Sequence, residues 1–191
     1  MVTENHREHL YTHMIRILDN VLKTGESDKL LNSITEDTFP WLLNKELIQY
    51  SDYKQYEHYQ LYHSLYETER NPKIRSNHYS TFAPIIQSFL SLSKTTGSLY
   101  RSKLNLLHNH YLSEKGSNPV HVDLKVAHTS MIYYINDSDG DTVFYENDKE
   151  IQRVQPVKNR LVVFEGPLKH CSNHPKNHEH RFVLNTVFST V

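Results

Sequence analysis

The stretch Pro119-Val120-His121-Val122-Asp123, near the middle of the chain, decides how the whole sequence is interpreted. An imidazole and a carboxylate two positions apart on an extended strand point to the same face. His121 and Asp123 can therefore bind one metal ion together, while Val122 points the other way. The chain contains 14 histidines, so this spacing is weak evidence until a third ligand is found.

The best candidate for a third ligand is His170, which follows the apolar run Leu161-Val162-Val163-Phe164. Two neutral imidazoles and one carboxylate on one side of an ion leave the opposite coordination positions open, which is the arrangement of non-haem Fe(II) sites. His174, four residues further on and followed by Pro175, lies in a loop-like stretch and is the weaker alternative. The predicted metal ligands are His121, Asp123 and His170.

The composition is that of one globular domain: the chain has 191 residues, of which 37% are hydrophobic and 23% are charged. A net charge of −1 provides no basic field for nucleic acid or anionic membrane, so the composition does not favour a nucleic-acid partner. A single cysteine, Cys171, excludes an internal disulfide and favours a reducing setting. The polar N-terminus and the lack of a long apolar run indicate no secretory leader and no membrane span, so we expect a cytoplasmic protein.

Residues 1–98 are predicted to be mainly helical and to pack on a sheet formed by the rest of the chain. Apolar residues at helical spacing indicate helices over residues 12–23 and 28–36, and a longer helix from Trp41 to about Arg70. Tyrosines recur every third residue from Tyr50 to Tyr62, and we interpret them as amphipathic rings that cover a sheet. A further helix is predicted over residues 83–93, with Pro84 in its first turn.

Residues 99–191 are predicted to form a β-domain, because the apolar period shortens from Leu99 onward and turn signals recur at close intervals. Many short strands of this kind indicate a sandwich or jelly roll. Helices followed by strands predict an α+β fold with the helices packed on one sheet, in a single domain overall. The predicted strands cover residues 104–108, 129–135, 142–145, 151–154, 160–164 and 181–188.

Four more segments add to the His121-Val122-Asp123 pattern. Ser130–Asn136 is a strand that ends Tyr-Ile-Asn, and Gly140-Asp141-Thr142-Val143-Phe144 has the form Gly-x-Thr-x-Phe. Arg160–Phe164 precedes His170, and Arg181 follows that histidine by eleven residues. In this order and spacing, the residues from Leu104 to Phe188 resemble the 2-oxoglutarate- and Fe(II)-dependent dioxygenases, most closely the prolyl 4-hydroxylase-like branch. Asp141 replaces the second glycine of that family's Gly-Gly-x-Thr-x-Phe segment.

The resemblance implies a double-stranded β-helix, the jelly-roll or cupin-like core, supported by N-terminal helices. It implies Fe(II) at His121, Asp123 and His170, with 2-oxoglutarate and O₂ as cosubstrates and ascorbate as a stimulating reductant. It also assigns Arg181 to the far carboxylate of 2-oxoglutarate. An arginine can make two parallel hydrogen bonds to a carboxylate, which a lysine cannot.

Two tyrosines resemble family residues that face the cosubstrate, namely Tyr134 on the strand after the His-x-Asp pair and Tyr111 on the strand before it. Either is equally compatible with a place in the ordinary core. Tyr133 and Tyr134 point to opposite faces of one strand, so at most one of them reaches the cosubstrate. The family often has a hydroxyl two residues after the arginine, where this chain has Val183. Thr129, Ser130 and Thr186 are alternative sources of that hydroxyl.

The resemblance implies hydroxylation of a C–H bond, coupled to conversion of 2-oxoglutarate into succinate and CO₂, with a prolyl residue in a protein as the first substrate to test. Fold-level analogy is poor evidence for a substrate, so an oxygenase that acts on a small molecule or a nucleobase remains an alternative. A second alternative is a non-catalytic, cupin-like module that binds a metal or a small acid. Three intact ligands together with Arg181 favour the enzyme.

Overall fold

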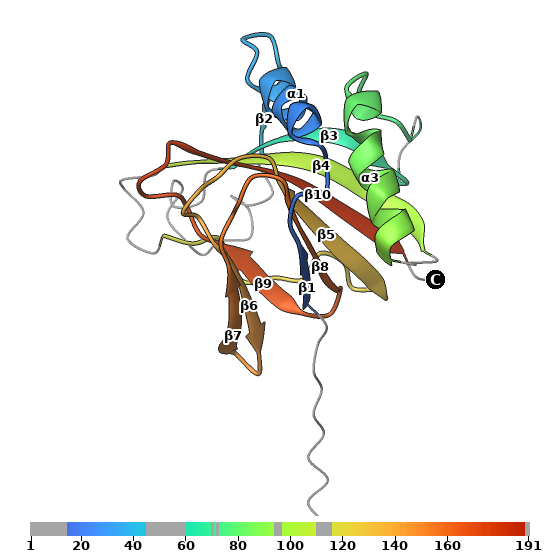
Figure 1. The fold of residues 1–191 in the computed structure, drawn as a ribbon. Coiled ribbons are helices and arrows are strands. Elements are labelled where there is room, and N and C mark those ends of the chain that lie inside the picture. Colours follow the sequence, from blue (N-terminus) through green and yellow to red (C-terminus); the bar gives the residue numbers. More distant parts are fainter. Residues whose placement is uncertain are drawn as a thin grey trace, which may run out of the picture.

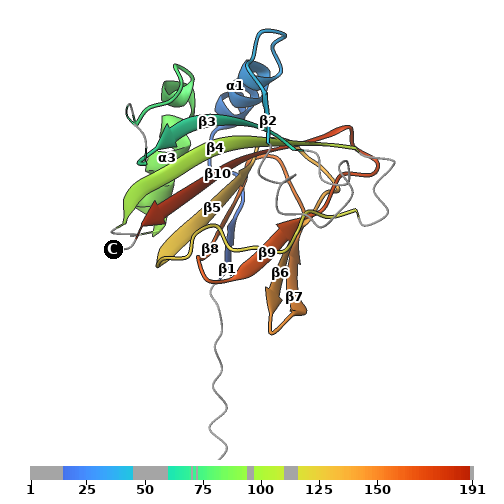
Figure 2. The same ribbon diagram turned by 180° about the vertical axis from the view of Figure 1, so that it is seen from behind.

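The computed structural model describes residues 15–44, 60–69, 71, 73–93, 97–109 and 116–189. Within these ranges the chain forms two antiparallel sheets and two helices that lie against the larger sheet (Figures 1 and 2). The elements are β1 (Ile15–Leu18), α1 (Thr24–Ile34), β2 (Leu42–Leu43), β3 (Leu61–Glu67), α3 (Tyr79–Ser93), β4 (Ser98–His108), β5 (His128–Tyr134), β6 (Thr142–Glu146), β7 (Lys149–Val154), β8 (Arg160–Glu165), β9 (Lys169–Ser172) and β10 (His180–Ser189).

The larger sheet has seven strands in the order β1-β8-β5-β10-β4-β3-β2, and the smaller has three in the order β7-β6-β9. Non-consecutive neighbours in both sheets mean that strands distant in the sequence lie side by side. Helices on one face of the large sheet and the small sheet on its other face give the predicted α+β jelly-roll architecture, so this prediction is confirmed (Figure 1).

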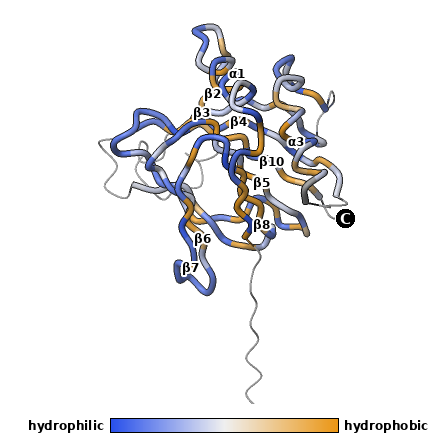
Figure 3. The backbone as a smooth tube through the Cα atoms, viewed as in Figure 1, coloured by the Kyte–Doolittle hydropathy of each residue, from blue (hydrophilic) through white to orange (hydrophobic). Residues whose placement is uncertain are grey.

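Alternation of side chains along the central strands divides the apolar core into two layers. In β5, Met131 and Tyr133 belong to the cluster that includes the helices, whereas Ile132 and Tyr134 belong to the cluster between the two sheets. This follows from the period of two along a strand, which sends successive side chains to opposite faces. Figure 3 accordingly shows hydrophobic stretches along the central strands of the large sheet, such as β5 and β8.

The two helices cover the outer face of the large sheet. From α3, Phe82 and Phe89 are fully buried, and the ring of Phe89 lies 4.6 Å from that of Phe188 on β10. The helices predicted over residues 28–36 and 83–93 are thus present, but they begin earlier, at Thr24 and Tyr79. Pro84 consequently lies inside α3 and not in its first turn as predicted. No helix in the described part of the chain is long and apolar enough to cross a membrane.

The helix predicted over residues 12–23 is wrong, because Ile15–Leu18 forms the edge strand β1. This strand pairs antiparallel with β8, and its end is held by two hydrogen bonds from Arg160 to Asp19, at 2.6 and 3.0 Å. A short apolar run satisfies helical spacing and strand alternation about equally well. The open edge of β8 decides between them, since it supplies backbone partners that the local sequence does not reveal.

The predicted long helix is also wrong where the structure describes it, because Leu61–Glu67 forms strand β3. This strand pairs with β4 and directs His63 and Leu65 toward the helices, so that both are buried. Tyr62 is part of β3, whereas Tyr50 and the rest of the tyrosine row lie outside the described residues. The N-terminal part of the chain therefore extends the large sheet as well as covering it.

Leu65→Ala should destabilise the protein by about 2–5 kcal/mol, because the side chain is completely buried and its loss leaves a cavity between β3 and the helices. Urea denaturation measures the change. The matched control is Leu42→Ala on β2, which removes the same atoms from a side chain that is 53% exposed and should cost no more than about 0.5 kcal/mol. Equal losses for the two variants would contradict the placement of β3.

Candidate metal centre

Two segments that are far apart in the sequence meet at the candidate metal centre. The backbone N–H of His121 donates to the carbonyl of His170, and the N–H of His170 donates to the carbonyl of His121, both at 2.9 Å. His170 lies on β9, a strand that the sequence analysis did not predict. His121 forms only this isolated bridge, so the expectation of a regular strand at His121–Asp123 is wrong. The reciprocal hydrogen bonds nevertheless hold the segment extended.

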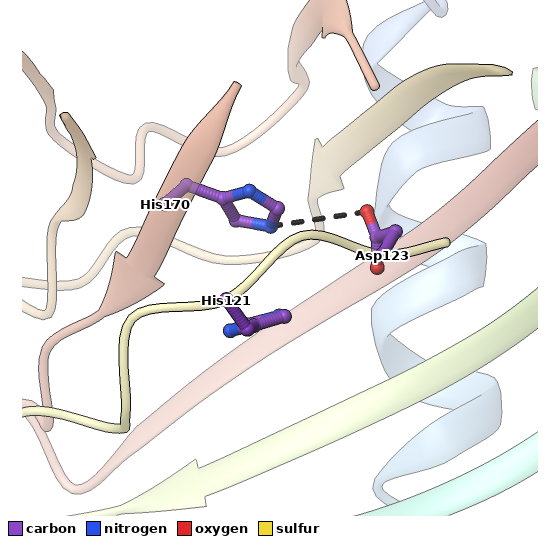
Figure 4. Close-up of side chains that lie close together, drawn as sticks. All are labelled: His121, Asp123 and His170. Carbon is purple, nitrogen blue, oxygen red and sulfur yellow. Dashed lines mark ion pairs between the residues drawn. The ribbon is translucent and has the colours of Figure 1, made fainter. Parts of the chain in front are cut away.

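The side chains of His121, Asp123 and His170 converge, and one ligand atom from each lies within 4.8 Å of the others (Figure 4). Nε2 of His170 lies 3.8 Å from Oδ2 of Asp123. His174, the alternative to His170, is buried elsewhere, with its Nδ1 3.4 Å from the carbonyl of His108. Within the described residues, the structure therefore brings together the three side chains named from the sequence and leaves out His174.

Both imidazoles are oriented by their own backbone. Nδ1 of His121 lies 3.0 Å from the carbonyl of Pro119, and Nδ1 of His170 lies 3.1 Å from the carbonyl of Leu168. A carbonyl oxygen can only accept, so Nδ1 carries the hydrogen and the lone pair of Nε2 is free to bind a metal. Burial lowers the pKa of His170 to about 4, which keeps this imidazole neutral and able to coordinate at neutral pH.

Asp123 is held by two neighbours that the sequence analysis did not identify in this role. A terminal nitrogen of Arg101 donates to Oδ1 at 3.1 Å, and the hydroxyl of Ser130 donates to Oδ2 at 2.6 Å. Burial alone would raise the pKa of Asp123, but His170, Arg101 and Ser130 hold it below its ordinary value, so the carboxylate is ionised. No spacing signal pointed to Arg101, because it reaches Asp123 only when β4 lies beside the loop.

A buried guanidinium lies on the same cavity as the three ligands. Arg181, on β10, is 2% exposed, and one of its terminal nitrogens donates to Oγ1 of Thr142 at 2.8 Å. Its carbon Cζ lies 5.5 Å from the ring centre of Tyr134, and its Nε has no hydrogen-bond partner. Burial lowers the pKa of Arg181, and no carboxylate among the described residues forms an ion pair with it. A buried cation of this kind fits an anionic ligand.

Thr142 provides the hydroxyl at this end of the cavity. The phenol of Tyr134 donates to Oγ1 of Thr142 at 2.6 Å, and this oxygen also accepts from Arg181, so the threonine O–H remains available to donate to a ligand. The hydroxyls considered from the sequence lie elsewhere: Ser130 binds Asp123, and Thr186 bonds to Ser102. The Gly-x-Thr-x-Phe segment was the available signal for Thr142.

Of the two candidate tyrosines, the structure describes one. Tyr134 lies against Arg181, whereas Tyr133 points to the opposite face and its phenol bonds to Asn159 at 3.1 Å. Tyr111 lies outside the described residues. Gly140 belongs to the same end of the site, because a Cβ there would come within 3.0 Å of the Arg181 side chain and within 2.6 Å of a backbone oxygen.

One cavity of about 600 Å³ connects the three ligands to Arg181. Ile132 and Val183 line it between the two ends, with Thr142 beside Arg181. Two neutral imidazoles and a carboxylate are the donor set that suits Fe(II), and they leave coordination positions open toward the cavity. The residues present therefore fit a metal ion at one end and a carboxylate-bearing ligand that reaches the other end.

Ser130→Ala should lower the affinity for Mn(II), a substitute for Fe(II), by about 10- to 100-fold, because Asp123 would lose the hydrogen bond that orients its carboxylate. Isothermal titration calorimetry measures the affinity. Ser102→Ala is the matched control, since it removes an equally buried serine hydroxyl whose partner is Thr186 and not a metal ligand. An equal loss in both variants would show that Ser130 does not act through Asp123.

Known proteins are similar to the part of the chain that holds these features. Residues 106–189 match the model of the 2OG-Fe(II) oxygenase superfamily, and this segment contains the three ligands and Arg181. A comparison with curated protein sequences gives no match.

Solved structures share the fold. A 2OG-Fe(II) oxygenase family oxidoreductase from Burkholderia pseudomallei is 11% identical, with a TM-score of 0.69 over 93% of this chain and 85% of that one. A prolyl hydroxylase from Trichoplax adhaerens, in complex with a hypoxia inducible factor peptide fragment, is 14% identical, with a TM-score of 0.65 over 94% and 84%. The epimerase SnoN from nogalamycin biosynthesis is 11% identical, with a TM-score of 0.65 over 91% and 76%. The matched segment covers 84 of the 191 residues and contains the converging side chains, so this part of the chain is similar to the 2OG-Fe(II) oxygenase superfamily, and the shared fold agrees with that similarity.

Proposed function

We propose that the chain is a hydroxylase in which His121, Asp123 and His170 hold Fe(II) and Arg181 holds the far carboxylate of 2-oxoglutarate. The single observation that supports this proposal best is the cavity that joins the two ends. It has the converging ligands at one end and, at the other, a buried guanidinium with no ion-pair partner among the described residues. A linear dicarboxylate that chelates a metal at one end places its second charge where Arg181 lies.

Each residue has a distinct task in this proposal. The imidazoles of His121 and His170 present Nε2 to the metal because their Nδ1 atoms are bonded to backbone carbonyls. Arg101 and Ser130 keep Asp123 ionised and oriented. When bound, Fe(II) with 2-oxoglutarate and O₂ supplies the oxidation that hydroxylates a substrate C–H bond and releases succinate and CO₂.

The far carboxylate would be held by three groups. Arg181 offers its fork and the unpartnered Nε–H, Thr142 offers its free O–H, and the Tyr134 ring closes the side of the pocket. Removal from water strengthens these charge-assisted hydrogen bonds. Apolar walls at Ile132 and Val183 exclude water along the length of the cosubstrate.

The first prime substrate to test is a prolyl residue in a peptide. The support is the family branch that the sequence resembles and the shared fold with a prolyl hydroxylase bound to a peptide fragment. The same fold also carries the epimerase SnoN, so oxidation of a small molecule is the second candidate. Peptides and small molecules are therefore tested side by side.

Purified protein with Fe(II), ascorbate and 2-oxoglutarate should produce succinate, because such sites turn over slowly without a prime substrate. The variant His121→Ala/Asp123→Ala should produce none, since two of the three ligands are lost. His178→Ala is the control, because this histidine is exposed and pairs with Asp139 outside the site. Prolyl peptides that raise the rate should gain one oxygen atom by mass spectrometry. Succinate that persists in the double variant would contradict the ligand assignment.

Arg181→Leu should weaken binding of 2-oxoglutarate to the Mn(II) protein by roughly 100-fold, because truncating one partner of a buried charge pair leaves the other unpaired. Arg181→Lys should recover part of the loss, since it restores the charge without the fork. Arg153→Leu is the control, because Arg153 makes its ion pairs near the surface with Glu150 and Asp141. Calorimetry measures each affinity, and an unchanged value for Arg181→Leu would remove Arg181 from the cosubstrate site.

A further inference from the structure

Two asparagines lie on the floor of the same cavity, on adjacent strands. Asn105 is on β4 and Asn185 is on β10, and both line the cavity. In the register of these strands Asn105 pairs with Val183 and Asn185 pairs with Lys103, so the two asparagines are diagonal neighbours on one face.

The register also places these asparagines relative to the metal ligands. Val187 of β10 pairs with both Arg101 and Ser130, the two residues that bind Asp123. Asn185 lies two residues before Val187 on β10, so its side chain points to the same face as that of Val187. The two positions are about 7 Å apart along the strand. Asn105 lies one strand further from β5, and so further from the line between Asp123 and Arg181. The pair therefore lies beside the space proposed for the cosubstrate, on the strands that also position the partners of Asp123.

Both side chains are more than nine-tenths buried, at 7% exposed for Asn105 and 6% for Asn185, yet neither Oδ1 has a hydrogen-bond partner. A buried acceptor without a partner lowers the stability of a folded protein, and most buried polar atoms are bonded to protein, to water or to a ligand. Asn136 is different, because its Oδ1 accepts from the N–H of Phe182 at 2.8 Å and its amide donates to the carbonyl of His180 at 3.0 Å. Two unpartnered oxygens on one cavity wall therefore point to a ligand that donates hydrogen bonds.

The cosubstrate cannot be that donor. At neutral pH 2-oxoglutarate carries two carboxylates and a ketone, all of which only accept hydrogen bonds. Of the two organic ligands in the proposed function, only the prime substrate can then donate to these oxygens, in place of water. A peptide group carries one N–H and one C=O, the same pair that an asparagine carboxamide carries, so each carboxamide can bind a peptide group in both directions. A second carboxamide pair on the wall, Asn44 and Gln60, bonded to each other at 3.0 Å, extends this polar surface.

We propose that Asn105 and Asn185 are specificity-determining residues that accept hydrogen bonds from peptide N–H groups of the prime substrate. The proposal rests on the proposed function, since it places a substrate beside Fe(II) and 2-oxoglutarate. It adds the basis of substrate specificity. The two asparagines recognise the amide N–H next to the oxidised residue, and a substrate without that donor is bound poorly.

Two small probes of equal size test the proposal: N-acetylproline N-methylamide, which has an N–H next to the prolyl carbonyl, and N-acetylproline methyl ester, which has an oxygen there. The protein is loaded with Mn(II) and 2-oxoglutarate, and paramagnetic relaxation of the probe protons reports binding near the metal. The amide should be relaxed at least threefold more than the ester. Asn105→Leu and Asn185→Leu should each reduce that difference. Equal relaxation of the two probes by the unmodified protein would overturn the proposal.

The same samples separate this proposal from the proposed function. If the unmodified protein fails to bind Mn(II) and 2-oxoglutarate, the proposed function fails; if both bind and the probes do not differ, only the role of the asparagines fails. A loss of 2-oxoglutarate affinity of more than tenfold in Asn185→Leu would assign Asn185 to the cosubstrate and overturn its role in substrate selection.

The melting temperature of the ligand-free variants separates a role in substrate binding from a structural role, because the two roles predict changes of opposite sign. Asn105→Leu and Asn185→Leu should each raise Tm by about 2–4 °C, because an unpartnered buried oxygen is replaced by a methyl group of similar size. Asn136→Leu, the same change at a partnered asparagine, should lower Tm. A lower Tm in all three variants would mean that Asn105 and Asn185 serve the fold, and would overturn the proposal.

Discussion

The alternation of side chains along β10 is the constraint on which the rest of the structure depends. This strand lies near the centre of the large sheet and is hydrogen-bonded to β4 and to β5. Phe182 and Leu184 join the core beneath the helices, while Arg181 and Asn185 line the cavity. A slip of one residue would exchange the two sets, moving the charge into the apolar layer and the apolar groups into the cavity. Fold and candidate site are therefore specified by the same register.

The cavity concentrates polar groups whose burial is unfavourable in the protein alone. Asp123 is compensated by Arg101 and Ser130, whereas Arg181 has, among the described residues, the hydroxyl of Thr142 and the face of a tyrosine ring beside it. Asn105 adds an acceptor without a partner. Such groups lower stability, and proteins retain them where ligand binding needs a prearranged partner. The same buried polar side chains thus lower the stability of the protein and provide the partners for the proposed ligands.

The residues that carried chemistry were predictable, and the elements that hold some of them were not. His121, Asp123, His170 and Arg181 were named from residue type, spacing and order along the chain, and all four lie on one cavity. Apolar periodicity predicted helices over residues 28–36 and 83–93, and the structure has them at 24–34 and 79–93. Strands β1 and β3 were taken for helices, because a short apolar run fits both periods and only its neighbour in the sheet decides. The partners of Asp123 could not be predicted, since Arg101 reaches it from another strand.

By itself, the sequence determined the α+β class and the set of candidate ligands, because these depend on local periodicity and on which side chains can bind a metal. The tertiary structure alone decided which backbone edges pair, which hydroxyl lies beside Arg181 and which buried oxygens are left without partners. These depend on the approach of segments distant in the chain, as in the reciprocal hydrogen bonds between His121 and His170. No local preference encodes such an approach, because its free energy arises only when both segments are in place.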